Sequence, residues 1–222
     1  MVAGTHERVV AAFDFDGTLS SRDNFLRFIR VVAGRAAIAR ALVAAVPPLA
    51  AARRDPSRRD DAKAVVLRKT LAGQREAHLR DLGARFARGV VAHHLHPEVV
   101  ARLDAHRAAG HELVLVSASL RYYLDPVAAR LGIAAVLGTE MALDGDGRLT
   151  GEIAGANVRG PEKVARLDAW LAGDGPATVY AYGDSDGDAE LLARADHAFR
   201  IDRRGRVPGG APLAAGGATA PR

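Results

Sequence analysis

Residues 11–20 read AAFDFDGTLS and follow a pair of valines. The apolar run that ends at Phe13 predicts a short buried strand, and the Asp-Gly pair that follows predicts the turn that closes it. Two carboxylates, Asp14 and Asp16, therefore stand one residue apart at the end of a buried strand. Burial of an uncompensated charge is costly, so this position requires a partner for each group.

Strand-like and helix-like segments alternate along the second half of the chain. The predicted strands are residues 112–116, 134–137, 177–182 and 197–201, and the predicted helices are residues 97–109, 122–131, 162–172 and 188–195. Repeated strand–helix units are typical of a doubly wound parallel sheet, that is, a Rossmann-like α/β core. Residues 139–153 interrupt the alternation and are predicted to form a hairpin.

Residues 20–96 show helical periodicity without a clear strand. Because this segment directly follows the first strand, we expect a helical cap inserted into the α/β core. The expected boundaries are residues 1–20 and 97–206 for the core and residues 21–96 for the cap. Residues 207–222 are rich in Gly, Ala and Pro, so we expect a disordered tail there.

The composition restricts the class of protein. The chain has 222 residues and no cysteine, which excludes disulfides and thiolate metal sites and agrees with a cytoplasmic location. The formal net charge of +5 fits nucleic-acid binding, but most basic residues are arginines scattered among Ala and Gly, so we expect no nucleic-acid partner. Within the most apolar segment the longest charge-free run is residues 41–52, shorter than the roughly 20 residues of a membrane span. We therefore expect no stable membrane insertion.

Polar side chains follow the predicted strands of the core. In an open α/β sheet, ligands bind at the carboxyl ends of the strands. The residues at those ends are Asp14, Asp16, Ser117, Ser119, Asp184, Asp186 and Asp188, with Lys163 near a helix start. Carboxylates gathered at one edge repel one another unless a hard cation holds them, and Mg²⁺ prefers oxygen ligands. A bound dication attracts a phosphate dianion. The expected phosphate donors are Ser117, Lys163 and the free N–H groups of Asp16, Gly17, Thr18 and Ala118.

Four segments resemble the motifs of the haloacid dehalogenase-like (HAD) superfamily. They are FDFDGTLS at residues 13–20, LVSAS at residues 115–119, Lys163 within GPEKVARL, and YGDSDGDAELL at residues 182–192. The resemblance covers nearly the whole chain apart from the tail. The helical insertion after the first motif resembles the branch of the superfamily that contains phosphoserine phosphatase.

This resemblance implies a phosphomonoester phosphatase that acts on a small phosphorylated metabolite through an aspartyl-phosphate intermediate. Asp14 would attack phosphorus, and Asp16 would protonate the leaving oxygen and then activate water. Mg²⁺ would be bound by Asp14, the backbone carbonyl of Asp16 and Asp184, and Asp188 would hold a metal-bound water. Family members that cleave carbon–halogen or carbon–phosphorus bonds lack a carboxylate at the position of Asp16. The carboxylate here therefore implies cleavage of a phosphate ester.

The resemblance leaves some assignments open. Ser117 and Lys163 would bind the transferring phosphoryl oxygens, yet phosphoserine phosphatases place this lysine directly before the glycine, where the chain has Arg159. Lys163 is favoured, and Arg159 is the alternative. Asp23 lies where phosphoserine phosphatases place a carboxylate that contacts the substrate amine, and it also fits a helix N-terminal cap. Gly187 replaces an asparagine that is usual in those enzymes, which speaks against phosphoserine as the substrate.

Two other functions remain open on the sequence alone. A phosphotransferase would use the same intermediate but pass the phosphoryl group to an alcohol or sugar. A non-catalytic basic binding protein would keep the fold without the chemistry, and the intact set of acids argues against it. The basic run at residues 53–61 fits a solvated loop or a contact with an acidic substrate or lipid headgroup. The sequence determines neither the physiological substrate nor the oligomeric state.

Overall fold

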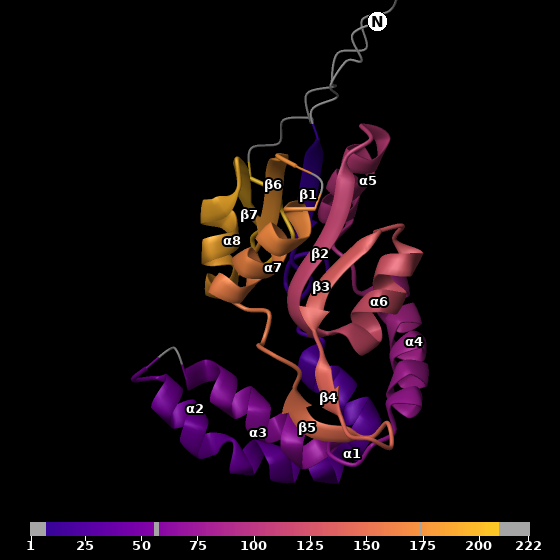
Figure 1. The fold of residues 1–222 in the computed structure, drawn as a ribbon, viewed down its shortest axis with the longest axis vertical. Helices are drawn as coiled ribbons and strands as arrows, with labels where there is room; N and C mark the ends of the chain where they lie inside the picture. Colours follow the sequence, from indigo (N-terminus) through magenta and orange to yellow (C-terminus); the bar gives the residue numbers. More distant parts are fainter. Residues whose placement is uncertain (1–7, 56–57, 174, 209–222) are drawn as a thin grey trace, which may run out of the picture.

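The computed structural model describes residues 8–55, 58–173 and 175–208. Its centre is a parallel sheet of five strands in the order β3-β2-β1-β6-β7 (Figure 1). The strands are β1 (Val9–Phe13), β2 (Glu112–Leu120), β3 (Ala135–Thr139), β6 (Thr178–Gly183) and β7 (His197–Arg200). The flanking helices are α5 (Pro97–Ala108), α6 (Arg121–Arg130), α7 (Pro161–Leu171) and α8 (Ala189–Arg194). The predicted doubly wound, Rossmann-like core is confirmed.

The central strand β1 is buried on both faces, which explains its continuous apolar run. Alternate residues of a strand point to opposite faces. Val10 and Ala12 belong to the core that includes residues of α7 and α8. Ala11 and Phe13 belong to the larger core, which includes residues of α5, α6 and the cap. Asp14 therefore lies directly after the central strand, at the carboxyl ends of the strands.

The insertion after β1 forms a helical cap at the carboxyl ends of the strands (Figure 1). Its helices are α1 (Phe25–Ala44), α2 (Val46–Ala52), α3 (Arg59–Leu71) and α4 (Glu76–His93). The α1 helix is interrupted at Gly34, where φ is 79°. Pro47 and Pro48 stand in the first turn of α2, where a missing N–H costs no helical hydrogen bond. None of the helices in the described ranges is long and apolar enough to cross a membrane.

Strand β2 is longer than predicted. The expected strand ends at Val116, whereas β2 continues to Leu120, with an irregular register against β3 between Ser117 and Leu120. Ser117 and Ser119 therefore belong to the strand itself. Ser117, Ala118 and Ser119 of this irregular stretch line the cavity described below.

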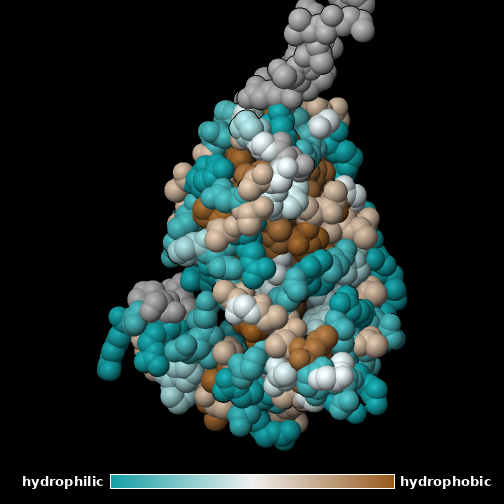
Figure 2. Space-filling model, in the orientation of Figure 1, coloured by the Kyte–Doolittle hydropathy of each residue, from teal (hydrophilic) through white to brown (hydrophobic). Residues whose placement is uncertain are grey.

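The predicted hairpin is present as β4 (Met141–Leu143) and β5 (Leu149–Ile153), and β5 packs against α3 of the cap. Val207, where the expected tail begins, is buried, and its N–H donates to Glu98 Oε1 at 2.8 Å. The remaining tail from residue 209 onward lies outside the described residues. On the face shown in Figure 2, hydrophilic side chains cover most of the surface and apolar ones appear in smaller patches.

Candidate active site

A cavity of about 600 Å³ lies where the strand ends of the core meet the cap. The core lines it with Asp14, Asp16, Ser117, Lys163, Asp184 and Asp188, and the cap lines it with Asp23, Phe25, Asp60 and Lys63. Charged groups from segments far apart in the sequence therefore share one small volume.

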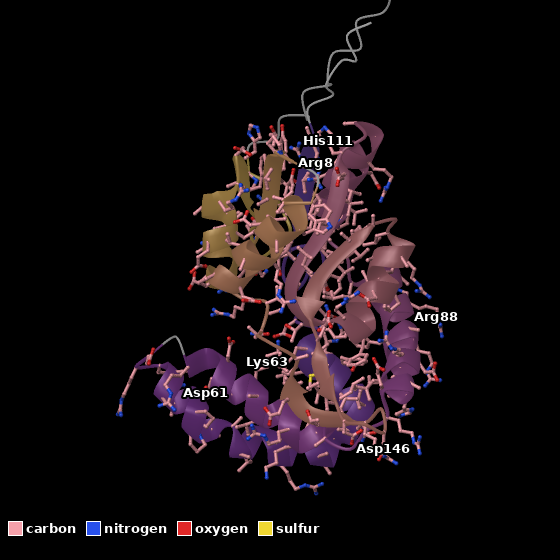
Figure 3. All side chains as sticks on the ribbon, viewed as in Figure 1. Arg8, Asp61, Lys63, Arg88, His111 and Asp146 are labelled. Atoms are coloured by element: carbon pink, nitrogen blue, oxygen red, sulfur yellow. The ribbon has the colours of Figure 1, made fainter. Side chains whose placement is uncertain are left out.

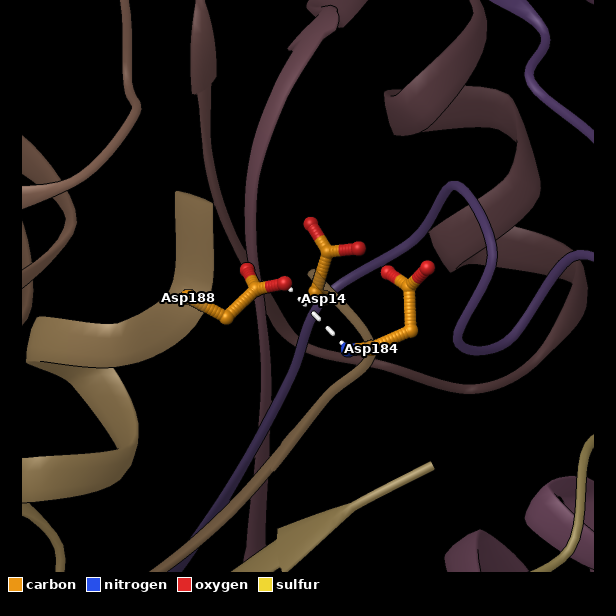
Figure 4. A group of neighbouring side chains, drawn as sticks. All are labelled: Asp14, Asp184 and Asp188. Atoms are coloured by element: carbon orange, nitrogen blue, oxygen red, sulfur yellow. Dashed lines mark hydrogen bonds between the residues drawn. The ribbon is translucent and has the colours of Figure 1, made fainter. Parts of the chain in front are cut away.

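Three carboxylates form a tight group on the floor of this cavity (Figure 4). One carboxylate oxygen from each of Asp14, Asp184 and Asp188 lies within 4.8 Å of the others. Asp14 follows β1 and Asp184 follows β6, and these adjacent parallel strands bring their carboxyl ends together. Asp188 closes a short 3₁₀ turn just after β6.

Lys163 supplies a buried cation to this group. Its Nζ donates to Asp14 Oδ1 at 2.5 Å and also to Asp188 Oδ1. Burial alone would lower the pKa of Lys163, but the two carboxylates raise it above its usual value. Burial also raises the pKa of Asp14, and the Lys163 ammonium opposes that rise. The three carboxylates and the Lys163 ammonium together have a formal charge of −2. This negative charge and the oxygen-only donor atoms fit a hard dication such as Mg²⁺.

Two glycines allow the carboxylates to approach so closely. A Cβ on Gly17, whose φ is +83°, would lie 2.3 Å from Asp184 Oδ2. A Cβ on Gly183 would lie 2.5 Å from Asp188 Cβ. Any side chain at either position would therefore displace a carboxylate from the group.

The orientation of Asp188 is set by hydrogen bonds. Its Oδ2 accepts from the Ser185 hydroxyl at 2.8 Å and from the N–H groups of Ser185 and Asp184 at 3.0 and 3.2 Å. The other oxygen, Oδ1, therefore faces Lys163. Although burial raises the pKa of Asp188, Lys163 and these hydrogen bonds lower it below its usual value.

The Asp16 side chain is held apart from this acidic group. Its Oδ1 accepts from the backbone N–H of Asn24 at 3.0 Å and from Asn24 Nδ2 at 2.7 Å, and its Oδ2 accepts from the Ser119 hydroxyl. Tyr123 in turn donates to Ser119 Oγ at 2.7 Å. Burial raises the pKa of Asp16 to about 6, while the hydrogen bonds from Ser119 and Asn24 oppose the rise. The two carboxylates of the opening stretch thus lie in different surroundings.

Of the other predicted site residues, Gly17, Asp23, Ser117 and Ala118 line the same cavity, whereas Thr18 is buried and does not. Ser117 is buried, and its Oγ accepts from the Ser119 N–H at 3.3 Å. Thr18 donates to Asp184 Oδ1 at 3.4 Å. Asp23 lines the cavity, and its carboxylate accepts from the Phe25 N–H at 2.9 Å, although the N-cap residue of α1 is Asn24.

The two candidate cations occupy different places. Lys163 contacts two of the carboxylates directly, whereas Arg159 stands at the cavity wall beside Gly187. A Cβ on Gly187 would lie 3.2 Å from Arg159 Nε. Of the two, Lys163 is therefore the cation in contact with the carboxylate group, and Arg159 lies elsewhere on the cavity wall.

A polar link between cap and core was not anticipated from the sequence. Lys63 of α3 lies on the side of that helix that faces the core (Figure 3), and its Nζ donates to the Ala118 carbonyl and to Asn157 Oδ1. Asn157 Nδ2 donates back to Asp60 Oδ1 at 2.8 Å. Burial lowers the pKa of Lys63 to about 8. Asp60 lies inside the basic run at residues 53–61, which fitted a solvated loop, and Lys63 follows that run. The structure instead begins α3 at Arg59, so Asp60 and Lys63 stand one helical turn apart on it.

The family model for haloacid dehalogenase-like hydrolases matches residues 11–193. The chain belongs to this family. Protein CicA of Caulobacter vibrioides is 37% identical over 199 residues, which cover 89% of this chain and 88% of CicA. Histidinol-phosphatase of Neisseria meningitidis is 29% identical over 127 residues, 55% of this chain and 57% of that protein. A substrate-bound phosphoserine phosphatase structure matches with a TM-score of 0.62 at 14% identity, covering 88% of this chain and 86% of that one. The protein is a haloacid dehalogenase-like hydrolase, and its fold is similar to that of phosphoserine phosphatase.

Proposed function

We propose that this hydrolase is a phosphomonoester phosphatase that cleaves a small phosphorylated metabolite through an aspartyl-phosphate on Asp14, with Mg²⁺ as cofactor. The observation that carries the proposal is the separation of two carboxylates, the buried Asp14 and the half-buried Asp16. Asp14 contacts Lys163 beside the acidic group, and Asp16 is held by Asn24 and Ser119. One carboxylate thus has the surroundings of a nucleophile and the other those of an acid.

Asp14 must be ionised to attack. Lys163 favours the ionised form because the ammonium lies 2.5 Å from Asp14 Oδ1 in a buried site. Asp14 and Asp184 would hold Mg²⁺ together with the Asp16 carbonyl, and Asp188 would hold a water on it; the bound ion would neutralise the cluster and polarise the phosphoryl group. An Asp14 oxygen then forms a bond to phosphorus as the bond to the leaving oxygen breaks.

Asp16 moves the proton. Its pKa of about 6 allows it to carry a proton for part of the time near neutral pH and to give it to the leaving oxygen. The ionised Asp16 then takes a proton from water, and that water attacks the phosphorus of the aspartyl-phosphate. Phosphate leaves and Asp14 is regenerated. Ser117 and the backbone N–H groups of Asp16 and Ala118 are the proposed donors to the phosphoryl oxygens. The N–H groups of Gly17 and Thr18, which the sequence led us to expect free, instead donate to the carbonyls of Ser20 at 2.8 Å and Phe15 at 3.3 Å.

The remainder of the substrate would lie between cap and core. Asp23 lines the cavity from the cap, and Arg159 lines it from the core. These two residues are the proposed contacts to the leaving portion of the substrate. The names of two similar proteins, histidinol-phosphatase and phosphoserine phosphatase, suggest histidinol phosphate and phosphoserine as the first compounds of a substrate screen. The oligomeric state does not enter this proposal.

Replacement of Asp14 by Asn tests the mechanism. Asn keeps the shape but is not a nucleophile, so turnover of p-nitrophenyl phosphate should fall on the order of 1,000-fold or more. Chelation by EDTA should also abolish turnover, and added Mg²⁺ should restore it. Asp168→Asn, which changes an exposed carboxylate paired with Arg194, is the matched control and should retain full activity. Turnover that survives either Asp14→Asn or chelation would refute the proposal, and less free phosphate than nitrophenol would indicate transfer to another acceptor.

A further inference from the structure

The cap carries an exposed apolar ridge where α1 meets α2. The ridge consists of Leu42, Val43, Val46 and Leu49, which are 42%, 73%, 58% and 53% exposed. The helical hydrogen bonds continue through Ala45, which donates to the Ala41 carbonyl and accepts from the Leu49 N–H, both at 3.0 Å. Residues spaced three and four apart therefore share one side. Ile38, Ala45 and Ala52, which stand three or four residues from Leu42 or Leu49, are buried together with Ala41, so the ridge runs along the border of the buried face.

Arginines stand on both sides of this ridge in the sequence, and Asp55 directly follows the last of them. Residues 24–54 contain Arg27, Arg30, Arg35, Arg40, Arg53 and Arg54, and no Asp or Glu. Five of these, at positions 30, 35, 40, 53 and 54, are exposed, and they form no ion pair with any residue that the structure describes. The ridge is thus a strip of apolar side chains flanked by arginines that have no ion-pair partner among the described residues.

We propose that the apolar ridge binds the surface of an anionic lipid membrane. In that arrangement Val43, Val46 and Leu49 enter the region between headgroups and acyl chains, and the flanking guanidinium groups contact lipid phosphates. The ridge is part of a helical segment that lies in the interface and does not span it, which agrees with the hydropathy of the helices.

An anionic lipid surface fits both the exposed apolar side chains of the ridge and the arginines that flank it. The other possible occupants fit only one of these two properties. A second copy of this chain would bring two arginine-rich strips together, with repulsion between like charges. A nucleic acid would pair with the arginines but would leave side chains as exposed as Val43 in water. None of the ridge residues lines the cavity, so docking leaves the catalytic groups accessible.

Vesicle co-sedimentation of the full chain tests this inference. Vesicles of phosphatidylglycerol mixed with phosphatidylcholine should sediment the wild type, with at least about tenfold tighter binding than to phosphatidylcholine alone, and added salt should weaken the binding. The double variant Val43→Glu/Leu49→Glu should lose at least about tenfold in binding, because each carboxylate meets both apolar and anionic surroundings. Leu143→Glu, at an exposed leucine of β4 outside the ridge, is the matched control and should bind like the wild type.

Several results would overturn the inference. These are no sedimentation of the wild type with anionic vesicles, equal binding by the double variant, and a wild-type dimer that dissociates in the double variant, which would show that a second copy covers the ridge. Circular dichroism and thermal unfolding should show that the double variant is folded, because both positions are exposed. Asp14→Asn should bind vesicles as the wild type does, so membrane binding and the proposed phosphatase chemistry can fail separately.

Discussion

Replacement of Asn24 by Ala tests the acid role proposed for Asp16. Asn24 is fully buried, and its Nδ2 donates to Asp16 Oδ1 at 2.7 Å. The substitution removes this bond and keeps two others, from the backbone N–H of residue 24 and from the Ser119 hydroxyl. A hydrogen bond to a charged group contributes about 1.5 to 3 kcal/mol, which corresponds to a factor of about 10 to 100 in rate if it is needed in the transition state.

The dependence on the leaving group distinguishes an acid from a structural residue. An alkyl phosphate such as glycerol 2-phosphate has a poor leaving group and needs the proton from Asp16, whereas p-nitrophenolate leaves without it. Asn24→Ala should therefore reduce kcat/KM about 10- to 100-fold for the alkyl ester and much less for the aryl ester. Ser20→Ala is the matched control, because Ser20 is as buried and also bonds Asn24 Nδ2, at 2.8 Å, but its hydroxyl does not contact the Asp16 carboxylate. An equal loss on both esters, or no loss on either, would refute the reasoning.

Two further predictions concern the metal group and the core. Gly17→Ala places a Cβ 2.3 Å from Asp184 Oδ2 at a φ of +83°. The Mg²⁺ concentration for half-maximal activity should therefore rise at least about tenfold. Gly145→Ala is the control, because the space around Gly145 is open, and it should leave that concentration unchanged. His106 is buried beside the Tyr182 hydroxyl, and burial lowers its pKa from 6.5 to about 4, so the unfolded chain binds the proton more readily. His106 therefore makes its full contribution to the free energy of unfolding above about pH 6.5. As the pH falls toward about 4, this free energy decreases by about 2 to 3 kcal/mol. Urea unfolding of the wild type and His106→Gln at about pH 7 and about pH 5 measures this; equal losses in both proteins would contradict it.

The core of the fold follows from local sequence rules. An apolar run closed by an Asp-Gly turn predicts β1, and alternation of strands with helices predicts the parallel sheet. Because parallel strands end at one edge, Asp14 and Asp184 were expected near each other although they stand at opposite ends of the chain. The same rule places Ser117 at that edge, although the extent of β2 to Leu120 was missed because serines interrupt its apolar pattern.

The contributions of the cap to the site could not be predicted in this way. Asn24 stands at a helix start, where its type is common for local capping, and nothing nearby in the sequence shows that it bonds Asp16. Lys63 reaches Ala118 and Asn157 because α3 docks over the ends of the strands. That docking depends on packing between segments far apart in the sequence, which helical periodicity does not encode.

The two departures from the phosphoserine phosphatase pattern are joined in the structure. A Cβ at Gly187 would lie 3.2 Å from Arg159 Nε and 3.3 Å from its Cγ, so Arg159 occupies the space that a larger residue at 187 would need. The backbones also meet there, because the Gly160 N–H donates to the Gly187 carbonyl at 2.9 Å. An asparagine at 187 would therefore require Arg159 to move, and the glycine and the arginine are best understood as one change. With Lys163 already beside Asp14, this change replaces a neutral amide by a cation at the wall of the cavity. We therefore expect the leaving portion of the substrate to differ from phosphoserine while the chemistry at phosphorus stays the same.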